Sequence, residues 1–155
     1  MATATSSTAA TAAANRTSEF IHTIRVGWAD CDPARIAYTG RIPYFALEAI
    51  DVWWENTIGL DWYRLNVDKD IGTPFVHLSI DFRKPVTPRH PLQCTVRLIR
   101  LGESSVRFAV AGRQDGDVCF EGQFVEVFVN AEAHVKRGIP EEFKTRLMAA
   151  LEQAG

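Results

Sequence analysis

Residues 42–58, IPYFALEAIDVWWENTI, form the most regular segment of the chain. Their apolar side chains recur at intervals of three and four residues, the spacing that places them on one face of an α-helix. The segment therefore predicts one amphipathic helix of about four turns. Pro43 suits the first turn of this helix, and Gly59 suits its end. The apolar positions are Ile42, Phe45, Ala46, Ala49, Ile50, Trp53 and Trp54.

Strand-like runs lie on both sides of this helix. Phe20–Trp28 is rich in β-branched and aromatic residues, and we expect it to form the first strand. After the helix we expect a loop through Trp62, Asn66 and Asp70, and beyond it the apolar period changes to two. The alternating apolar residues Val76, Leu78, Ile80 and Phe82 are typical of a half-buried strand.

The rest of the sequence predicts three more strands and a terminal helix. The strands are expected at about Leu92–Leu101, Ser105–Arg113 and Val118–Val129, with a hairpin turn at Gln114–Asp117. The helix is expected over Pro140–Glu152. This order indicates an α+β protein in which one antiparallel sheet covers one apolar helix.

The composition indicates a single globular domain. A chain of 155 residues with 46% hydrophobic residues can form one proper core, which we expect over residues 19–155. Residues 1–18 are mostly Ala, Thr and Ser, without the apolar region of a secretory signal, and are expected to form a flexible tail. A net charge of -2 and the lack of a long apolar stretch argue against nucleic-acid or membrane partners.

Cysteine and histidine usage gives no sign of a metal centre. Cys31, Cys94 and Cys119 form no CxxC pair, and the four histidines form no HxxxH pair. We therefore expect neither a structural metal nor a disulfide framework. The lack of paired cysteines favours a cytoplasmic, reducing location.

The segment Asp30–Ile36, DCDPARI, carries the strongest functional signal. It is preceded by Gly27–Trp28 and followed closely by the predicted helix. It resembles the active-site segment of the 4-hydroxybenzoyl-CoA thioesterase family, which enters the central helix of a hot-dog fold. The resemblance covers roughly Ile24–Pro140, and the D-C-D-P-A string is its most specific part. It implies a hot-dog domain that hydrolyses an acyl-CoA thioester without a cofactor.

The resemblance also implies which residues carry the reaction. The family's catalytic carboxylate corresponds to Asp32, and Thr39 stands where the family supplies a backbone N–H to the oxyanion. Thioester hydrolysis needs a nucleophile on the carbonyl carbon and donors on the developing oxyanion, and amides at a helix N-terminus suit the second task. Asp32 could attack directly or could deprotonate water, and the sequence leaves both routes open.

Other residues compete with Asp32 for this role. Asp followed by Pro is common at turns, so Asp32 could instead be a turn or capping residue. Asp30 is expected to hold the loop. Glu48 enters because a related hot-dog subgroup uses a carboxylate from the central helix. Cys31 has no activating base nearby in the sequence and is expected to be a small buried core residue.

Four residues are candidates for substrate binding. Trp62 follows the central helix and could stack on an aromatic acyl group. His77 lies on the polar face of its predicted strand and could line the acyl pocket, although a hydrogen-bonded interface histidine fits equally. Ser105 falls where the resembled family has a comparable residue. Arg35 replaces the family's Gly and could lower the pKa of Asp32, meet a substrate anion or point to solvent.

A second departure concerns CoA binding. Gly102 and Glu103 stand where a member of the resembled family has two arginines that grip the nucleotide phosphates. Any CoA phosphate must therefore be met by other cations. The candidates are Lys84, Arg89, Arg100, Arg107 and Lys136.

The expected assembly is a homo-oligomer. Relatives that the resemblance brings in are dimers or tetramers with CoA lying across a subunit boundary, and a thin sheet around one helix leaves an apolar edge to cover. Three functions remain open from the sequence. They are hydrolysis of a small aromatic acyl-CoA such as 4-hydroxybenzoyl-CoA, hydrolysis of a short-chain acyl-CoA or acyl-carrier-protein thioester, and binding of acyl-CoA without turnover.

Overall fold

The computed structural model describes residues 19–153, so the predicted tail over residues 1–18 lies outside the described residues. Within this range a five-stranded antiparallel sheet accompanies three α-helices. The helices are α1 (Arg41–Ile58), α2 (Trp62–Lys69) and α3 (Glu141–Gln153). The strands are β1 (Phe20–Ile24), β2 (Ile71–Gly72), β3 (Phe75–Phe82), β4 (Leu92–Leu101), β5 (Ser105–Gln114), β6 (Asp117–Val127) and β7 (Val129–Asn130).

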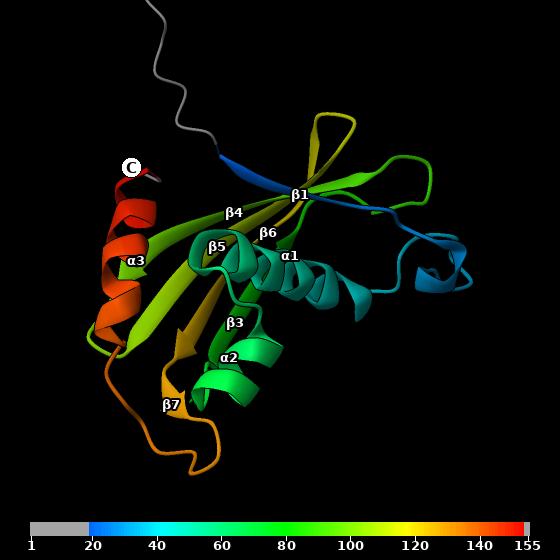
Figure 1. Cartoon of the computed structure of the whole chain (residues 1–155). Coiled ribbons are helices and arrows are strands. Elements are labelled where there is room, and N and C mark those ends of the chain that lie inside the picture. The colour runs from blue at the N-terminus through cyan, green and yellow to red at the C-terminus, as the bar shows by residue number, and fades with distance from the viewer. Residues whose placement is uncertain (1–18, 154–155) are drawn as a thin grey trace, which may run out of the picture.

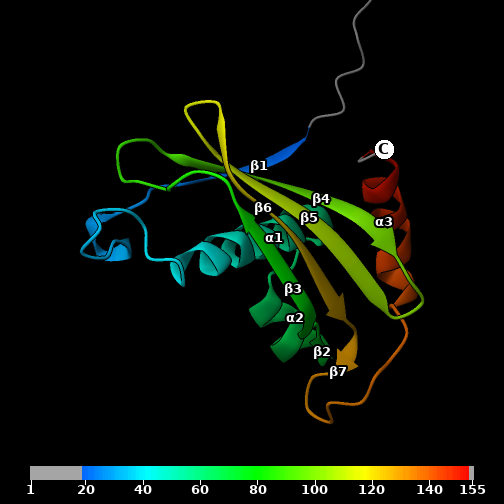
Figure 2. The same ribbon diagram turned by 180° about the vertical axis from the view of Figure 1, so that it is seen from behind.

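The large sheet has the strand order β1-β4-β5-β6-β3, and β2 pairs separately with β7. Figure 1 shows α1 lying across one face of this sheet, and the reverse view in Figure 2 shows the sheet in front of the helix. This is the hot-dog arrangement that the family resemblance implies, with one sheet around one long helix. The α+β fold class is thereby confirmed.

The core forms where α1 meets the inner face of the sheet. All the apolar positions predicted for the helix are buried, and Ala46, Ala49, Ile50 and Trp54 are fully so. The Trp53 ring packs edge-on against Phe108 of β5 with a centroid separation of 4.8 Å. Burying an aromatic side chain of this kind contributes about 2–3 kcal/mol to the free energy of folding. The helix ends at Gly59, whose φ of 88° lies in the left-handed region that favours glycine.

Two predicted boundaries are wrong. The first strand ends at Ile24, and Trp28 instead opens a short 3-10 helix, η1 (Trp28–Asp30), because the chain must turn from the sheet toward α1. The expected loop after α1 is largely helix α2. The Asp61 carboxylate accepts a hydrogen bond from the N–H of Arg64 at 2.8 Å, which caps this helix. Within α2 only Leu65 is buried, so the segment has no apolar period to reveal it.

The strand β3 is an edge strand with an open inner face. Leu78 and Phe82 pair with the fully buried Phe124 and Phe120 of β6, so they share the face that carries α1. The predicted alternation is therefore correct for Leu78, Ile80 and Phe82, whereas Val76 falls out of phase and is 61% exposed. However, Leu78 is 43% and Phe82 55% exposed, because α1 packs mainly on β1, β4 and β5, away from the β3 edge of the sheet. A bulge between Phe75 and His77 shifts the register at the start of the strand.

The later elements follow the sequence closely. Asp115 and Gly116 form the predicted hairpin turn, with φ values of 49° and 81°. The long last strand is interrupted at Phe128, which separates β6 from β7. The terminal helix α3 packs against β4 and the end of α1 (Figure 1). No helix in residues 19–153 is long and apolar enough to cross a membrane.

Candidate active site

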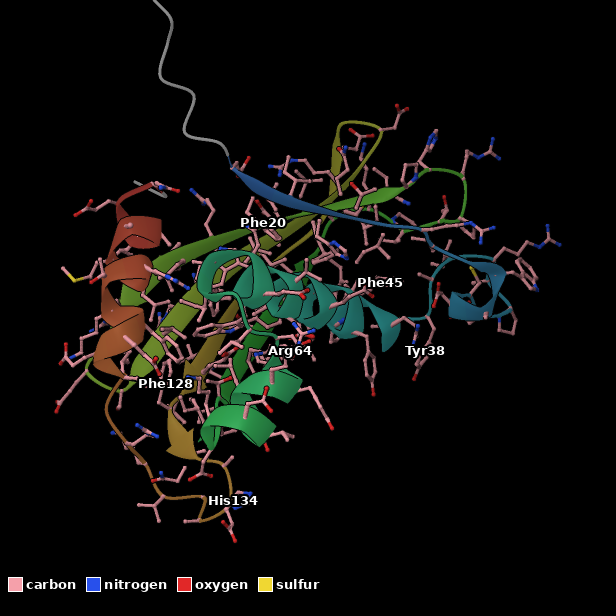
Figure 3. All side chains as sticks on the ribbon, in the orientation of Figure 1. Phe20, Tyr38, Phe45, Arg64, Phe128 and His134 are labelled. Atoms are coloured by element: carbon pink, nitrogen blue, oxygen red, sulfur yellow. The ribbon has the colours of Figure 1, made fainter. Side chains whose placement is uncertain are left out.

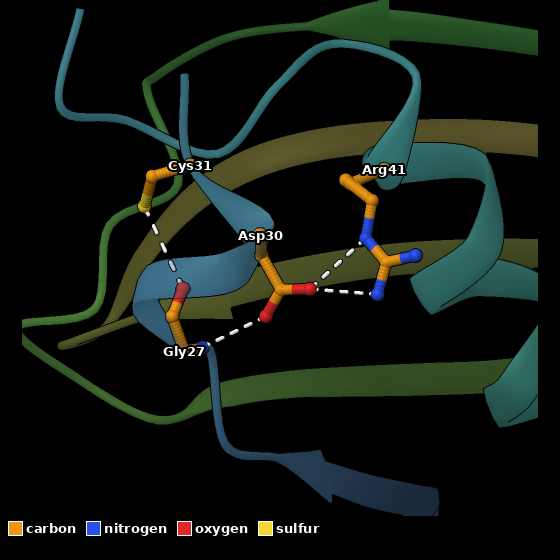
Figure 4. A network of polar contacts seen from close by, with 4 residues as sticks. All are labelled: Gly27, Asp30, Cys31 and Arg41. Atoms are coloured by element: carbon orange, nitrogen blue, oxygen red, sulfur yellow. Dashed lines mark hydrogen bonds and ion pairs between the residues drawn. The ribbon is translucent and has the colours of Figure 1, made fainter. Parts of the chain in front are cut away.

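The loop that joins β1 to α1 is anchored by Asp30. One carboxylate oxygen accepts a hydrogen bond from the N–H of Gly27 at 2.8 Å, and the other accepts two from the Arg41 guanidinium at 2.9 and 2.6 Å (Figure 4). The Gly27 amide and the Arg41 cation hold the pKa of Asp30 below its usual value, and partial burial opposes them. Asp30 thus holds the loop, as the sequence suggested.

The Cys31 side chain is not in the core. It is half-buried in the loop, and its thiol donates a long 3.6 Å hydrogen bond to the carbonyl of Gly27 (Figure 4). The prediction of a buried core residue is therefore wrong, because the loop leaves the sheet before this position. No base lies in contact with the thiol within the described residues, so the geometry gives it no means of activation.

Asp32 forms the turn that follows. Its Oδ1 accepts a 2.8 Å hydrogen bond from the N–H of Ala34, and its backbone carbonyl accepts one from the N–H of Arg35. The side chain therefore closes an Asx turn, the alternative role that the sequence left open. Within residues 19–153 the second carboxylate oxygen, Oδ2, forms no hydrogen bond. Asp32 is half-buried, so this oxygen is partly shielded from solvent and has no competing hydrogen bond within the described residues.

Arg35 completes the turn in a strained conformation. Its φ of 65° lies in the left-handed region, which L-residues other than glycine, Asn and Asp rarely adopt. The position is therefore one that glycine fits best, which gives a physical reason for the glycine in the resembled family. The Arg35 side chain is exposed.

Two backbone amides are free where the loop enters α1. The N–H of Tyr38 donates to Asp30, that of Arg41 to Tyr38 and that of Ile42 to Thr39. By contrast, the N–H groups of Thr39 and Gly40 donate no hydrogen bond within the described part of the chain. Gly40 is the N-cap of α1, so both amides lie at the positive end of the helix dipole.

An apolar cleft of about 270 Å³ lies beside these amides. It is walled by the loop, by the first turn of α1 and by the segment after β3. The Asp32 N–H donates to the carbonyl of Ile36, a cleft residue, so Asp32 lies one backbone hydrogen bond from the wall. The lining residues are Ile36, Ala37, Thr39, Ile42, Phe82, Arg83, Lys84, Pro85 and Val86.

The cations at the rim of the cleft are paired with acids of β6. The Lys84 ammonium lies 2.7 Å from the Asp117 carboxylate, and the Arg83 guanidinium lies 3.5 Å from that of Glu121. All four side chains are exposed, so each pair is readily exchanged for another anion. Of the five cations suggested for CoA phosphates, Lys84 is the one that lines the cleft.

The structure separates the predicted residues into two groups. Asp32, Arg35 and Thr39 lie at the N-terminal end of α1, whereas Trp62 follows its C-terminal end. Figure 3 marks the two regions by Tyr38, which lies next to Thr39 in the chain, and by Phe128. The Phe128 ring packs on Trp54, in the C-terminal half of α1. A helix of 18 residues spans about 27 Å, so a single chain does not bring Trp62 to Asp32.

His77 and Ser105 lie away from the cleft of their own chain. His77 is exposed and pairs with Val125, on the face of the sheet opposite to α1. Ser105 opens β5 beside Gly102 in the β4–β5 hairpin, and its carbonyl accepts a hydrogen bond from the Gly102 N–H. Their substrate-binding roles stay predictions.

Of two further carboxylates, Glu48 was a candidate from the sequence and Glu126 was missed. Glu48 is exposed on α1 and accepts a hydrogen bond from His22 of β1 at 2.8 Å. Glu126 was not noticed in the sequence, yet it is fully buried on the inner face of β6. Its position in phase with Phe120 and Phe124 is the signal that could have revealed it. No group of His, Cys, Asp and Glu in residues 19–153 has the arrangement of a metal site.

Comparison with known proteins agrees with this fold. Residues 26–147 match the thioesterase-like superfamily, and the chain belongs to this superfamily. A thioesterase superfamily protein from Jannaschia sp. CCS1 is 47% identical, with a TM-score of 0.84 over 86% of this chain and 94% of that one. No curated protein matches the chain significantly by sequence.

Two more distant solved structures share the fold. A 1,4-dihydroxy-2-naphthoyl-CoA thioesterase from Synechocystis is 21% identical, with a TM-score of 0.75 over 83% of this chain and 95% of that one. A gentisyl-coenzyme A thioesterase is 22% identical, with a TM-score of 0.73 over 80% of this chain and 98% of that one. The resemblance to hot-dog thioesterases is therefore confirmed at the level of the family.

Proposed function

We propose that this protein hydrolyses the CoA thioester of a small aromatic acid, such as 4-hydroxybenzoyl-CoA, to the free acid and CoA. The observation that carries the proposal is the meeting of three features at one end of α1. They are a half-buried carboxylate with a free oxygen, two free backbone amides and an apolar cleft. Thioester hydrolysis requires this combination of nucleophile or base, oxyanion donors and acyl pocket.

In the general-base route, Asp32 takes a proton from a water molecule. The resulting hydroxide attacks the carbonyl carbon, and the carbonyl oxygen becomes an oxyanion that the N–H groups of Thr39 and Gly40 stabilise. The C–S bond then breaks, and the CoA thiolate leaves with a proton returned from Asp32. In the covalent route the Oδ2 of Asp32 attacks first, CoA leaves, and water hydrolyses the mixed anhydride. The same residues serve both routes.

The cleft supports a small acyl group. Its wall is mainly aliphatic, with the Phe82 ring at one side, and about 270 Å³ suits a single aromatic ring better than a long chain. Lys84 at the rim is placed to exchange Asp117 for a CoA phosphate. Arg35, which is exposed close to Asp32 in the chain, is a second cation for a substrate anion.

A second copy of the chain would complete the site. β3 is an edge strand whose inner apolar face is open, so a partner's β3 can pair with it about a two-fold axis. Antiparallel pairing about the middle of the strand sets Phe82 of one copy opposite the partner's Phe75. Since Phe82 lines the cleft and Phe75 contacts Trp62, the partner's Trp62 would reach the acyl group. We propose a dimer of this kind, or a tetramer built from it.

A thiol-release assay with a panel of thioesters tests the proposal. Release of CoA from aromatic acyl-CoAs supports it, whereas release only from short-chain acyl-CoAs or acyl-carrier-protein thioesters supports the second candidate. Tight binding of acyl-CoA without release would indicate a binding domain. Asp32→Asn is expected to reduce kcat by about 10²–10⁴-fold. Asp115→Asn, at a left-handed hairpin position that Asn tolerates, is the matched control.

A further inference from the structure

Glu126 is a fully buried carboxylate that the proposed reaction does not use. It lies on the inner face of β6, and its Oε2 accepts a hydrogen bond from the Trp54 indole N–H of α1 at 3.1 Å. Its other oxygen, Oε1, is buried and has no hydrogen-bond partner among the described residues. A buried oxygen of this kind costs free energy unless a polar neighbour approaches it.

A second unpartnered polar atom lies beside this oxygen. The indole N–H of Trp62 is also buried and has no hydrogen-bond partner within residues 19–153. The Trp62 ring packs edge-on against Phe75 at 5.6 Å, and Phe75 pairs directly with Glu126 across the β3–β6 ladder. The indole N–H of Trp62 and the hydroxyl of Thr73 lie close enough to Glu126 to act on the pKa of its carboxyl. Since an indole can only donate, Glu126 is the group toward which Trp62 is directed.

The surroundings of Glu126 oppose a negative charge. The pKa of Glu126 is raised to about 8, with burial as the largest cause and the nearby Asp51 of α1 acting in the same direction. The two indoles and Thr73 act in the opposite direction. No Lys or Arg of the described residues acts on the pKa of Glu126. The residues that pair with Glu126 on the neighbouring strands are apolar, Phe75 on β3 and Val106 on β5. The folded protein therefore holds Glu126 mainly as a neutral acid near neutral pH.

The helix α2, which begins at Trp62, has little buried surface to hold it. Only Leu65 of α2 is buried, and the start of this helix is held by the hydrogen bond from the Trp62 N–H to the Asp51 carboxylate at 2.8 Å. A charge that forms on Glu126 has to draw in water or additional donors. Displacing α2 and Trp62 would admit that water with little loss of packing, because α2 buries only Leu65.

We propose that Glu126 is a proton-dependent positioning residue, which in its neutral form keeps Trp62 and the start of α2 packed against α1 and releases them when it ionises. The role in catalysis rests on the proposed function, in which Trp62 contacts the acyl group. The conformational part does not depend on any enzymatic activity.

Unfolding measured from pH 5 to 9.5 tests the proton linkage. A raised pKa means that the stabilisation is complete below the ordinary value of 4.5 and is lost as pH rises toward about 8. The unfolding equilibrium constant of the parent should therefore rise by up to about tenfold per pH unit in this window and level off above it. Glu126→Gln, which is neutral at every pH, should abolish this component. An unchanged slope in the variant would overturn the proposal.

Two more variants keep this test decisive. The pKa of Asp51 is also raised by burial, so Asp51→Asn shows how much of the slope belongs to Asp51 instead. If Glu126→Gln does not fold, Trp54→Phe is the alternative variant. The Trp54 indole donates to Oε2 and so favours the charged form of Glu126. Its loss should therefore move the upper end of the slope to higher pH. A slope that ends at the same pH in Trp54→Phe would contradict the assignment to Glu126.

The position of Trp62 is read separately. The difference between the fluorescence of the parent and of Trp62→Phe isolates the Trp62 emission, which should shift to the red as pH rises through about 8. The same difference measured in the Glu126→Gln background should not change with pH. If the protein hydrolyses aromatic thioesters, KM should rise over the same pH range with less change in kcat. No thioesterase activity at any pH, with an intact fluorescence shift, would refute the function alone, and a Trp62 emission that ignores pH would refute the positioning role.

Discussion

The Arg41 guanidinium donates two hydrogen bonds, at 2.9 and 2.6 Å, to one carboxylate oxygen of Asp30. Arg41 is the first residue of α1, and Asp30 ends the 3-10 turn that follows β1. The pair therefore fixes both ends of the loop that carries Asp32 and the free amides of Thr39 and Gly40. The candidate catalytic group is held in place by its neighbour two residues earlier in the sequence.

Asp30→Asn should weaken the fold and make it less sensitive to acid. The pKa of Asp30 is lowered, so its contribution is fully present above the ordinary value of 3.8 and is lost as pH falls through the folded-state value. The variant should lose ~1 kcal/mol at neutral pH, a modest value because Arg41 stays partly in solvent. Its stability should then change less than that of the parent between pH 5 and 2, as urea unfolding can measure. Equal acid sensitivity in both proteins would contradict this role.

Arg35→Gly should stabilise the protein. The φ of 65° at this position strains any residue with a Cβ, and glycine removes the strain while adding some entropy to the unfolded chain. The balance should raise the stability by about 0.5–1 kcal/mol. Thermal unfolding measures this change, and Arg35→Lys, which keeps the charge and the strain, is the control. If the activity of the parent and of Arg35→Lys falls at high salt while that of Arg35→Gly does not, the cation also meets substrate.

The sequence predicted the central helix and the strands well because their apolar periods are strong. The buried positions of α1 are those expected from the spacing of Ile42, Phe45 and Trp53. It did not predict α2, because a helix that buries only Leu65 has no apolar stripe and is stabilised by its Asp61 cap. Local capping of this kind is a weaker signal in sequence than a buried face.

The candidate site was predictable only in part. Asp32 and Thr39 came from a resemblance, and the sequence could not reveal that the amides of Thr39 and Gly40 stay free, since this depends on backbone geometry. Trp62 was expected to stack on an aromatic acyl group, and the sequence could not reveal that the length of α1 separates it from Asp32 within one chain. A buried acid such as Glu126 is hard to predict, because a glutamate in a strand ordinarily indicates the solvent-facing side.

Gly112→Ala should destabilise the sheet. Gly112 of β5 lies opposite Phe120 of β6, and an added Cβ would fall 2.1 Å from the fully buried Phe120 ring. The ring has no free space to move into, so the expected loss is about 1–3 kcal/mol in the free energy of unfolding. Gly138→Ala is the control, because its Cβ would approach nothing closer than the Glu103 carbonyl oxygen at 3.9 Å. Urea unfolding of the two variants should differ clearly, and a loss of equal size in both would rule out the Phe120 contact as the cause.

Leu78→Asp should break the proposed dimer. Leu78 lies on the inner face of the edge strand β3, where it is 43% exposed in the single chain, and a carboxylate there would have to be buried on association. We expect the parent to sediment as a dimer or larger species and the variant to shift toward monomer, with the dissociation constant raised at least about tenfold.

Met148→Asp on α3 is the control for this experiment. Met148 is 54% exposed, and α3 packs on β4, which β5 and β6 separate from β3 in the sheet. It should leave the sedimentation unchanged. Because the partner's Trp62 is proposed to complete the acyl pocket, thioesterase activity should fall in Leu78→Asp as the monomer fraction grows. An active monomer would show instead that each cleft works alone.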